Sequence, residues 1–293
     1  MEVWRGKGGR TRPDTEVRSG HPPASPKFHV GRGSRDLRQR GHRFNMLCPF
    51  RTRASEFMTK PPSPSNGEPL QDPAPPSATA LFSGQLRDET ELLHRRAERS
   101  GIMASLLRGD IDRRAYCTLL SSLLAIYRPL EEGLGARADH PWIASLPLAG
   151  LARSAAIEQD LATLGHEGPP DPVAAATALG ERIARHARDR PHLLVAHAYV
   201  RYMGDLSGGR ALGSVVRRAL SLRGSDGLAF YAFSPALDPG EVKHAFRAAL
   251  DGIPGHPIPG VDEAEVELIR EAGLAFRSHI LIFDQVEERR SRA

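Results

Sequence analysis

Residues 193–209, LLVAHAYVRYMGDLSGG, decide the fold of this chain. Apolar and amphipathic side chains recur at helical spacing through the first half of this segment, which predicts a helix. Gly204, Gly208 and Gly209 then follow within six residues, around the carboxylate of Asp205. Each glycine inside a helix costs about 1 kcal/mol relative to alanine, so three of them favour a helix that bends or that lies with its backbone against a bulky flat ligand.

A helix that ends at these glycines, followed by a loop, is the alternative, because glycine is common where helices stop. The sequence LGSVVRRAL begins three residues after Gly209, and there the helical spacing of apolar residues resumes. A helix that continues through the glycines is therefore the stronger prediction.

The chain from residue 79 onward carries almost only helical patterns. A first amphipathic helix is interrupted at Ser100-Gly101, and a longer helix further on is expected to bend at Pro129. Paired runs of alternating polar and apolar residues, which would predict strands, do not occur. The pattern predicts a single all-α domain over residues 79–293. Further helix starts are predicted at Asp110 or Asp112, at Asp171-Pro172 for a helix over residues 174–188, at Asp238 or Pro239, and at Asp262.

Residues 1–78 differ in composition from the rest of the chain, with many Arg, Gly, Pro and Ser residues. Such a segment holds too little apolar surface to offset the chain entropy lost on folding, so it is predicted to be disordered. Three explanations remain open. The segment is a dispensable tail, or translation really begins at Met46 or Met58, or the segment is a transit peptide, since such leaders are rich in Arg and Ser.

The net charge of +5 arises at one end of the chain. Residues 1–60 hold 14 Lys and Arg against 5 Asp and Glu, which leaves 26 basic and 30 acidic residues in the remainder. The basic balance therefore does not describe the predicted domain. It gives no reason to expect a nucleic-acid partner.

Hydropathy and cysteine spacing bear on the location of the protein. No stretch approaches the roughly 18 apolar residues of a membrane span, and the C-terminal EERRSRA is charged, so no membrane anchor is expected. Cys48 and Cys117 lack the spacing of a metal or disulfide motif. Free thiols in a reducing cytoplasm are the expectation.

Residues 196–209, AHAYVRYMGDLSGG, resemble the signature of the heme oxygenase family, in its animal and bacterial branch. The resemblance extends from about Gln85 to about Glu288 and so covers the whole predicted domain. It implies an all-α fold in which haem lies between a proximal first helix and a kinked, glycine-rich distal helix.

One histidine near the start of the domain is a candidate iron ligand. His94 lies on the edge of an apolar stripe, where a lone histidine is most often a satisfied core or boundary residue. A neutral imidazole is also a common haem ligand, and the resemblance implies that His94 is the proximal one. Glu98 follows one turn later and is well placed to hold the other ring nitrogen. By residue type alone, His192, His197, His244 and His279 are rival ligands.

The glycines and Asp205 are candidates for the other side of the haem. Gly204 and Gly208 are one turn apart and would face the same way, so a helix could lie closely over a porphyrin there. The resemblance places Gly209 against the haem as well. Asp205 can hold a network of ordered water that donates hydrogen bonds and supplies a proton, which is the role that the resemblance implies for it.

Further residues around this network follow from the resemblance alone. It places Tyr127, Arg201 and Phe276 near the distal water or in the wall of the pocket. At position 279 the family often has asparagine, whereas this chain has a histidine. This departure leaves the role of His279 open.

Cations are expected at the haem edge that carries the two propionates. Arg87 lies two turns before the predicted proximal ligand, and Lys243 and Arg247 form an i,i+4 pair. Each of these alone is more often a solvated surface charge. The resemblance implies that they bind the propionates together with Tyr199. Arg87 stands where the family often has lysine, and a guanidinium suits a carboxylate at least as well.

The resemblance implies the activity of a heme oxygenase, with haem as both cofactor and substrate. Haem would be opened to biliverdin with release of carbon monoxide and ferrous iron. Electrons would come from a separate ferredoxin or flavoprotein reductase, because no glycine-rich dinucleotide loop follows a strand in this sequence. A haem-binding or haem-sensing protein without turnover is the alternative. The intact Gly204-Asp205 pair favours turnover, since a storage protein needs no distal proton network.

Overall fold

The segment that decides the fold lies in one uninterrupted helix, α7 (Leu194–Ala219), which follows the short 3-10 helix η1 (Pro191–Leu193). The computed structural model describes residues 81–165 and 170–293 of the chain. Helical structure continues through Gly204, Gly208 and Gly209, as predicted. The alternative, a helix that ends at the glycines, is wrong.

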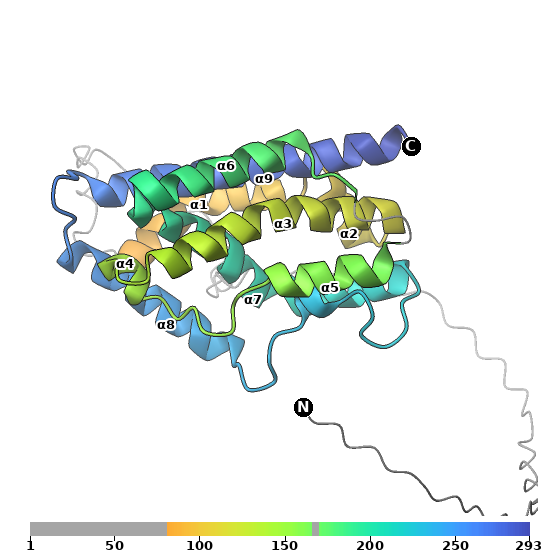
Figure 1. The fold of residues 1–293 in the computed structure, drawn as a ribbon, viewed down its shortest axis with the longest axis horizontal. Coiled ribbons are helices and arrows are strands. Elements are labelled where there is room, and N and C mark those ends of the chain that lie inside the picture. The colour runs from red at the N-terminus through yellow and green to blue at the C-terminus, as the bar shows by residue number, and fades with distance from the viewer. Residues whose placement is uncertain (1–80, 166–169) are drawn as a thin grey trace, which may run out of the picture. The chain divides into compact units, whose positions relative to one another are not determined.

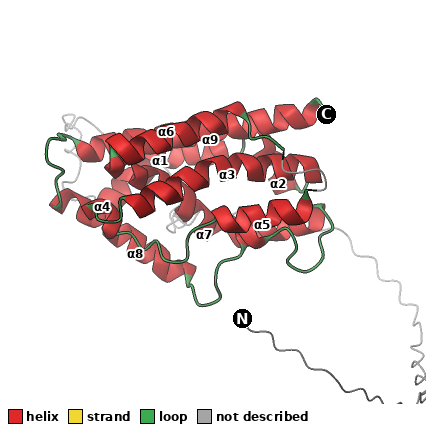
Figure 2. Ribbon diagram, in the orientation of Figure 1, coloured by secondary structure: helices red, strands yellow, loops and turns green. Residues whose placement is uncertain are grey.

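All regular structure in the described residues is helical, and Figure 2 shows no strand among them. None of these helices combines the length and the apolar character needed to cross a membrane. The predicted disorder of residues 1–78 and the boundary at residue 79 lie outside the described residues. The other helices are α1 (Phe82–Ala97), α2 (Gly101–Arg108), α3 (Arg113–Ala136), α4 (Pro141–Ala144), α5 (Ser154–Leu164), α6 (Ala174–Asp189), η2 (Ala229–Tyr231), α8 (Pro239–Gly252), η3 (Ile253–Gly255) and α9 (Ala264–Ser291).

Helix α3 runs through the middle of the helical part, between α6 and α5 (Figure 1). Its side chains at Leu120, Ile126 and Leu130 are fully buried. Burying one such side chain contributes about 1.5–3 kcal/mol, so this helix supplies much of the core. Helix α9 packs along α1, α2, α6 and α7. It therefore joins the two helices, α1 and α7, that carry most of the predicted site.

Helix α3 continues through Pro129, and α6 approaches it closely one turn earlier. Proline has no N–H, so it cannot donate to the carbonyl of Ala125, four residues before it. A Cβ atom added at Gly180 of α6 would lie 2.2 Å from that carbonyl oxygen. Only glycine allows the two helices to come so near at this point.

Several helix boundaries follow the predicted capping residues. The break at Ser100-Gly101 separates α1 from α2. The carboxylate of Asp112, and not that of Asp110, caps α3 by accepting a hydrogen bond from the amide of Ala115 at 2.8 Å. Asp238 caps α8 by accepting from the amides of its first turn. These boundaries are set by local chemistry that the sequence contains.

The helix predicted over residues 174–188 is confirmed as α6, and the start signal at Asp171-Pro172 lies just before it. Val173 precedes α6, is buried, and its amide donates to Ser122 Oγ at 3.1 Å. One predicted helix start is displaced. Helix α9 begins after Glu263 rather than at Asp262, and Glu263 has a left-handed backbone with φ of 59°.

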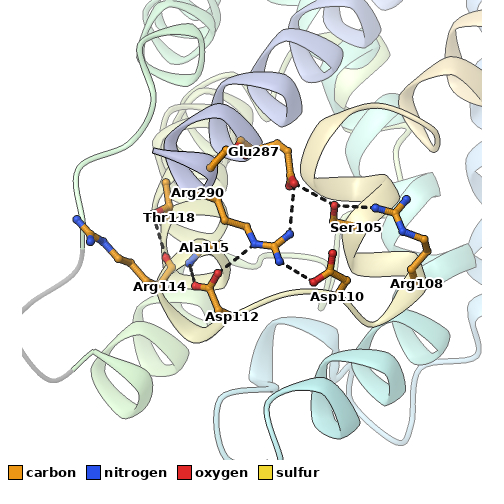
Figure 3. Close-up of polar contacts among 10 residues, drawn as sticks. Ser105, Arg108, Asp110, Asp112, Arg114, Ala115, Thr118, Glu287 and Arg290 are labelled. Atoms are coloured by element: carbon orange, nitrogen blue, oxygen red, sulfur yellow. Dashed lines mark hydrogen bonds and ion pairs between the residues drawn. The ribbon is translucent and has the colours of Figure 1, made fainter. Parts of the chain in front are cut away.

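The end of α9 is tied to the loop between α2 and α3 by one guanidinium (Figure 3). Arg290 donates to Asp110 at 2.6 Å, to Asp112 at 3.1 Å and to Glu287 at 3.3 Å. Glu287 also accepts a hydrogen bond from Ser105 at 3.2 Å. Asp112 thus caps α3 and anchors α9 at once, which explains why the two aspartates flank this turn.

A buried carboxylate joins α6, α7 and α9. Glu271 accepts from Arg182 Nε and Nη2 at 2.7 and 2.5 Å, and the Nε2 atoms of His186 and His197 lie 3.2 and 2.9 Å from its Oε1. His186, His197 and Glu271 are close enough together to hold a metal ion. The guanidinium already occupies both carboxylate oxygens, however, and a cation beside it would be repelled. We interpret this group, the Glu271 cluster, as structural.

Glu271→Gln is expected to lower the free energy of unfolding by about 2 kcal/mol, because Arg182 then loses a charged acceptor in a buried place. Urea unfolding of the full chain measures this change. Glu288→Gln is the matched control on the same helix, since Glu288 pairs with Arg292 in an exposed contact of 3.5 Å. The control is expected to change stability by less than about 0.5 kcal/mol.

The same cluster predicts the direction of the pH dependence of stability. Burial alone would raise the pKa of Glu271, but the hydrogen bonds from Arg182 and the nearby Nε2 atoms of the two histidines hold this pKa well below its usual value. Burial also lowers the pKa of His197. Both groups therefore stabilise the fold at neutral pH, and this contribution is lost as the pH falls below about 6.5 for the histidine and about 4.3 for the glutamate. In Glu271→Gln the loss below about pH 4.3 should be smaller; parallel curves would contradict this assignment.

Candidate functional site

A cavity of about 970 Å³, counting the space that is open to solvent, lies between α1, α2, α7 and α9. Helices far apart in the sequence build its walls. It is lined by His94, Ala97 and Glu98 at the end of α1, by Met103 of α2, by Tyr199, Val200, Arg201, Met203, Gly204, Asp205, Ser207, Gly208 and Leu212 of α7, and by Phe276, His279 and Phe283 of α9.

His94 lies in the α1 wall of the cavity with its ring edge-on to Phe276, at 5.7 Å between ring centroids. Its Nδ1 atom is buried and has no hydrogen-bond partner among the described residues. Glu98 Oε1 is 3.9 Å from Nδ1, which is too long for a hydrogen bond. The expected hydrogen bond from the His94 ring to Glu98 is therefore not formed, although Glu98 lies beside the ring.

Gly204 is the point where the cavity meets the backbone of α7. A Cβ atom added at Gly204 would have no protein atom within 4 Å, so packing inside the protein does not require a glycine here. Alanine would stabilise the helix by about 1 kcal/mol. The glycine thus keeps open a space that the protein itself does not fill. Gly208 lines the cavity one turn later, whereas Gly209 does not line it and lies under Tyr231.

Asp205 is held by two side chains on the protein side of the cavity. The hydroxyl of Tyr127 donates to Oδ2, and Arg201 Nη2 donates to Oδ1 at 2.8 Å. Arg201 Nε also donates to the Tyr127 oxygen at 3.0 Å, so the three side chains are hydrogen-bonded to one another. Burial raises the pKa of Asp205, and the charge of Arg201 and the hydroxyl of Tyr127 oppose this rise. The carboxylate is therefore fixed in orientation while it still lines the cavity.

The predicted propionate ligands are only partly brought together. Tyr199 lines the cavity, but Arg87, Lys243 and Arg247 do not. Arg87 contacts the neighbouring Asp88, and burial together with the charge of Arg247 lowers the pKa of Lys243. Helix α8, which carries these last two cations, packs against α1 and α7.

Other lining residues were not singled out by sequence reasoning. Met103 comes from α2, and Phe283 from α9. The sequence does contain a signal for Phe283, because Phe276, His279 and Phe283 have the i, i+3, i+7 spacing of one helix face. No comparable pattern marks Met103.

The heme oxygenase family model matches residues 80–285, which hold the whole cavity. The chain belongs to the heme oxygenase family. Its enzyme class is that of a heme oxygenase, an oxidoreductase. Among its relatives, a heme oxygenase of Takifugu rubripes is 34% identical over 211 residues, which are 71% of this chain and 74% of the relative. Heme oxygenase 1 of a Synechocystis strain is 32% identical over 210 residues, 70% of this chain and 85% of the relative.

Solved heme oxygenase structures have the same fold. The crystal structure of the Synechocystis heme oxygenase-1 in complex with heme matches with a TM-score of 0.66 at 30% identity, and covers 73% of this chain and 95% of that one. The heme oxygenase of Leptospira interrogans matches with a TM-score of 0.64 at 30% identity, over 70% and 99% of the two chains. The all-α single-domain prediction is confirmed.

The residues of this heme oxygenase fit a haem group. The imidazole of His94 lines one wall of the cavity, and the backbone at Gly204 has no protein atom in front of it in another. An imidazole suits haem iron, and a bare helix surface suits the flat ring. The lining is otherwise mainly apolar, as a porphyrin requires.

Gly204→Ala is expected to keep or raise the stability of the fold but to weaken haem binding about tenfold, because the new methyl group enters the space beside the helix. Absorbance titration with haemin measures the affinity, and urea unfolding measures the stability. Gly135→Ala is the matched control: Gly135 lies in α3, is exposed, and has no atom within 4 Å of an added Cβ. An unchanged haem affinity in Gly204→Ala would show that this space is not the haem contact.

Proposed function

We propose that this chain opens haem oxidatively to biliverdin, with release of carbon monoxide and ferrous iron, in the cavity between α1, α7 and α9. The observation that carries the proposal is the presence around one cavity of His94 from α1 and the bare backbone at Gly204 from α7. Haem is both substrate and cofactor, and its iron would supply the centre at which oxygen is activated.

On the α1 side, His94 would hold the iron through its imidazole. Phe276 packs edge-on against this ring and restricts its rotation. Glu98 lies 3.9 Å from Nδ1, and a small side-chain rotation would bring it to hydrogen-bond distance. Such a carboxylate contact makes an imidazole a more basic ligand.

On the α7 side, Gly204 and Gly208 would let the flat ring approach the helix, with Gly209 supporting the same stretch. Asp205 would hold water in the cavity with the lone pairs that Tyr127 and Arg201 leave free. A water bound to a carboxylate is oriented and can pass on a proton. Tyr127 and Arg201 would act by fixing the Asp205 carboxylate.

Further residues would place the edges of the haem. Arg87, Lys243 and Arg247 supply positive charge on α1 and on the neighbouring α8, and Tyr199 supplies a hydroxyl at the cavity. Together they would bind the two propionates. Cation–carboxylate contacts of this kind fix the rotation of the ring and so the position that is attacked.

Electrons would come from a separate ferredoxin or flavoprotein reductase. The described residues form one helical unit without the strand-loop-helix of a dinucleotide site, which supports an external donor. The free, buried thiol of Cys117 supports a reducing, cytoplasmic location.

A haemin titration of the full chain, followed by a reductant under air, tests the proposal. A Soret band that forms and then gives way to the absorbance of biliverdin is the expected result. If haem binds but survives reduction under air, the chain is a haem-binding or haem-sensing protein instead. If haemin does not bind, the function is wrong.

A further inference from the structure

One histidine in the cavity has a ring nitrogen that the protein leaves unused. His279 of α9 is 2% exposed, and its Nδ1 atom lies 2.8 Å from the carbonyl oxygen of Ala275. A carbonyl oxygen can only accept a hydrogen bond, so Nδ1 carries the proton. In the neutral ring Nε2 then has no hydrogen and presents a lone pair. This Nε2 atom is buried and has no hydrogen-bond partner among the described residues. An unsatisfied buried acceptor costs about 1–3 kcal/mol.

The Nε2 lone pair of His279 belongs to a side chain of the candidate haem cavity. His279 lines the same cavity as Asp205 and Gly204. Phe276, one turn earlier on α9, contacts His94 of α1, and Phe283, one turn later, lies against the ring of His279 at 6.1 Å between ring centroids. Because α7 and α9 pack against each other, the cavity wall that carries His279 adjoins the wall that carries Asp205.

The ring of His279 is neutral at neutral pH. Burial, and then the charge of Arg201, lower the pKa of His279 to about 3. A neutral ring whose only hydrogen is committed to Ala275 cannot donate into the cavity. It can only accept.

We propose that His279 is a positioning residue of the site, whose Nε2 accepts a hydrogen bond from a water molecule held in the cavity beside Asp205. The proposal rests on the proposed function. Because His279 accepts and cannot donate, it fixes which way this water points: one hydrogen is turned toward α9, and the other remains for Asp205 or for the ligand. An amide side chain, which can donate or accept, would leave both orientations open.

The tautomer is tested first, without haem. Nitrogen-15 NMR of the histidine rings in the full chain is expected to show one ring protonated at Nδ1 that does not titrate near pH 6.5. His279→Leu, which has a similar volume, identifies the signal by its loss. If the ring of His279 is protonated at Nε2, or if it titrates near pH 6.5, the proposal is wrong.

The water is tested in the ferric haem complex. A crystal structure is expected to place a water within about 3.2 Å of Nε2 in the native chain, to lack it in His279→Leu, and to regain it at the side-chain oxygen of His279→Gln. The pH at which the Soret band changes should fall by about 0.5–1 unit in His279→Leu and recover in His279→Gln, because an acceptor favours the protonated form of the water. His256→Leu, the same substitution at an exposed histidine outside the cavity, should leave this pH unchanged.

The outcomes separate this proposal from the proposed function. A low-spin spectrum that disappears in His279→Leu would mean that Nε2 binds the iron itself, and the proposal would then be wrong. A native complex without water at Nε2 would overturn it too. Failure of haemin to bind would instead refute the proposed function, while the NMR result would still decide whether Nε2 is an acceptor.

Discussion

Asp205→Asn is expected to bind haem with nearly native affinity but to form biliverdin about 100- to 10,000-fold more slowly, the range typical of a lost proton-transfer group. The asparagine keeps the shape of the side chain, so the cavity is preserved. Its amide cannot accept from both Tyr127 and Arg201 as the carboxylate does. Water in the cavity then loses its oriented acceptor. Single-turnover absorbance after reduction under air measures the rate.

Asp226→Asn is the matched control for this experiment, because Asp226 is exposed and lies outside the cavity. Asp205→Ala is the less informative change, since it leaves the buried guanidinium of Arg201 without its ion partner and is expected to destabilise the fold by about 3–5 kcal/mol. A native turnover rate in Asp205→Asn would remove Asp205 from the mechanism.

His94→Ala is expected to weaken haem binding by about 100-fold or more, since even the groups that only support a metal ligand contribute 10- to 100-fold. The Soret band and the spin state should change with it. The substitution removes one imidazole from the cavity wall, so added imidazole should restore much of the native spectrum. Haemin titrations with and without imidazole measure both effects.

His256→Ala serves as the control, because His256 is exposed and lies outside the cavity. If His94→Ala keeps the native iron spectrum, another histidine is the ligand. His279, the other histidine that lines the cavity, would then be the first to test.

The parts of this molecule that sequence could predict depend on short-range chemistry. The continuation of α7 follows from apolar spacing on both sides of the glycines, and the caps at Asp112 and Asp238 follow from a side chain that bonds an amide two or three residues away. The place of His94 in the cavity wall agrees with its position on one helix and with the family motif around it, while its role as iron ligand stays a prediction. Each of these inferences needs only a few consecutive turns of chain.

What could not be predicted depends on contacts between distant segments. At the start of α6, Val173 is buried and its amide donates to Ser122 of α3, which lies 51 residues away in the sequence. The Glu271 cluster brings Arg182 and His186 of α6 and His197 of α7 to one carboxylate on α9, and no spacing in the sequence pairs these three helices. The same holds for Glu98, where a correct i+4 spacing still leaves the carboxylate 3.9 Å from the ring. Spacing gives the face of a helix but not the final rotamer.

The Glu271 cluster has a geometric consequence for the cavity. His197 on α7 contacts Glu271 on α9, and each helix continues eight residues from there to a polar group of the cavity, Asp205 on one and His279 on the other. At about 1.5 Å per residue, both groups lie about 12 Å along their helices from the shared contact. A slip of one residue between α7 and α9 would move them about 1.5 Å apart along the axis. The Glu271 cluster, whose residues do not line the cavity, therefore fixes the axial register of α7 and α9 without any contribution from a ligand.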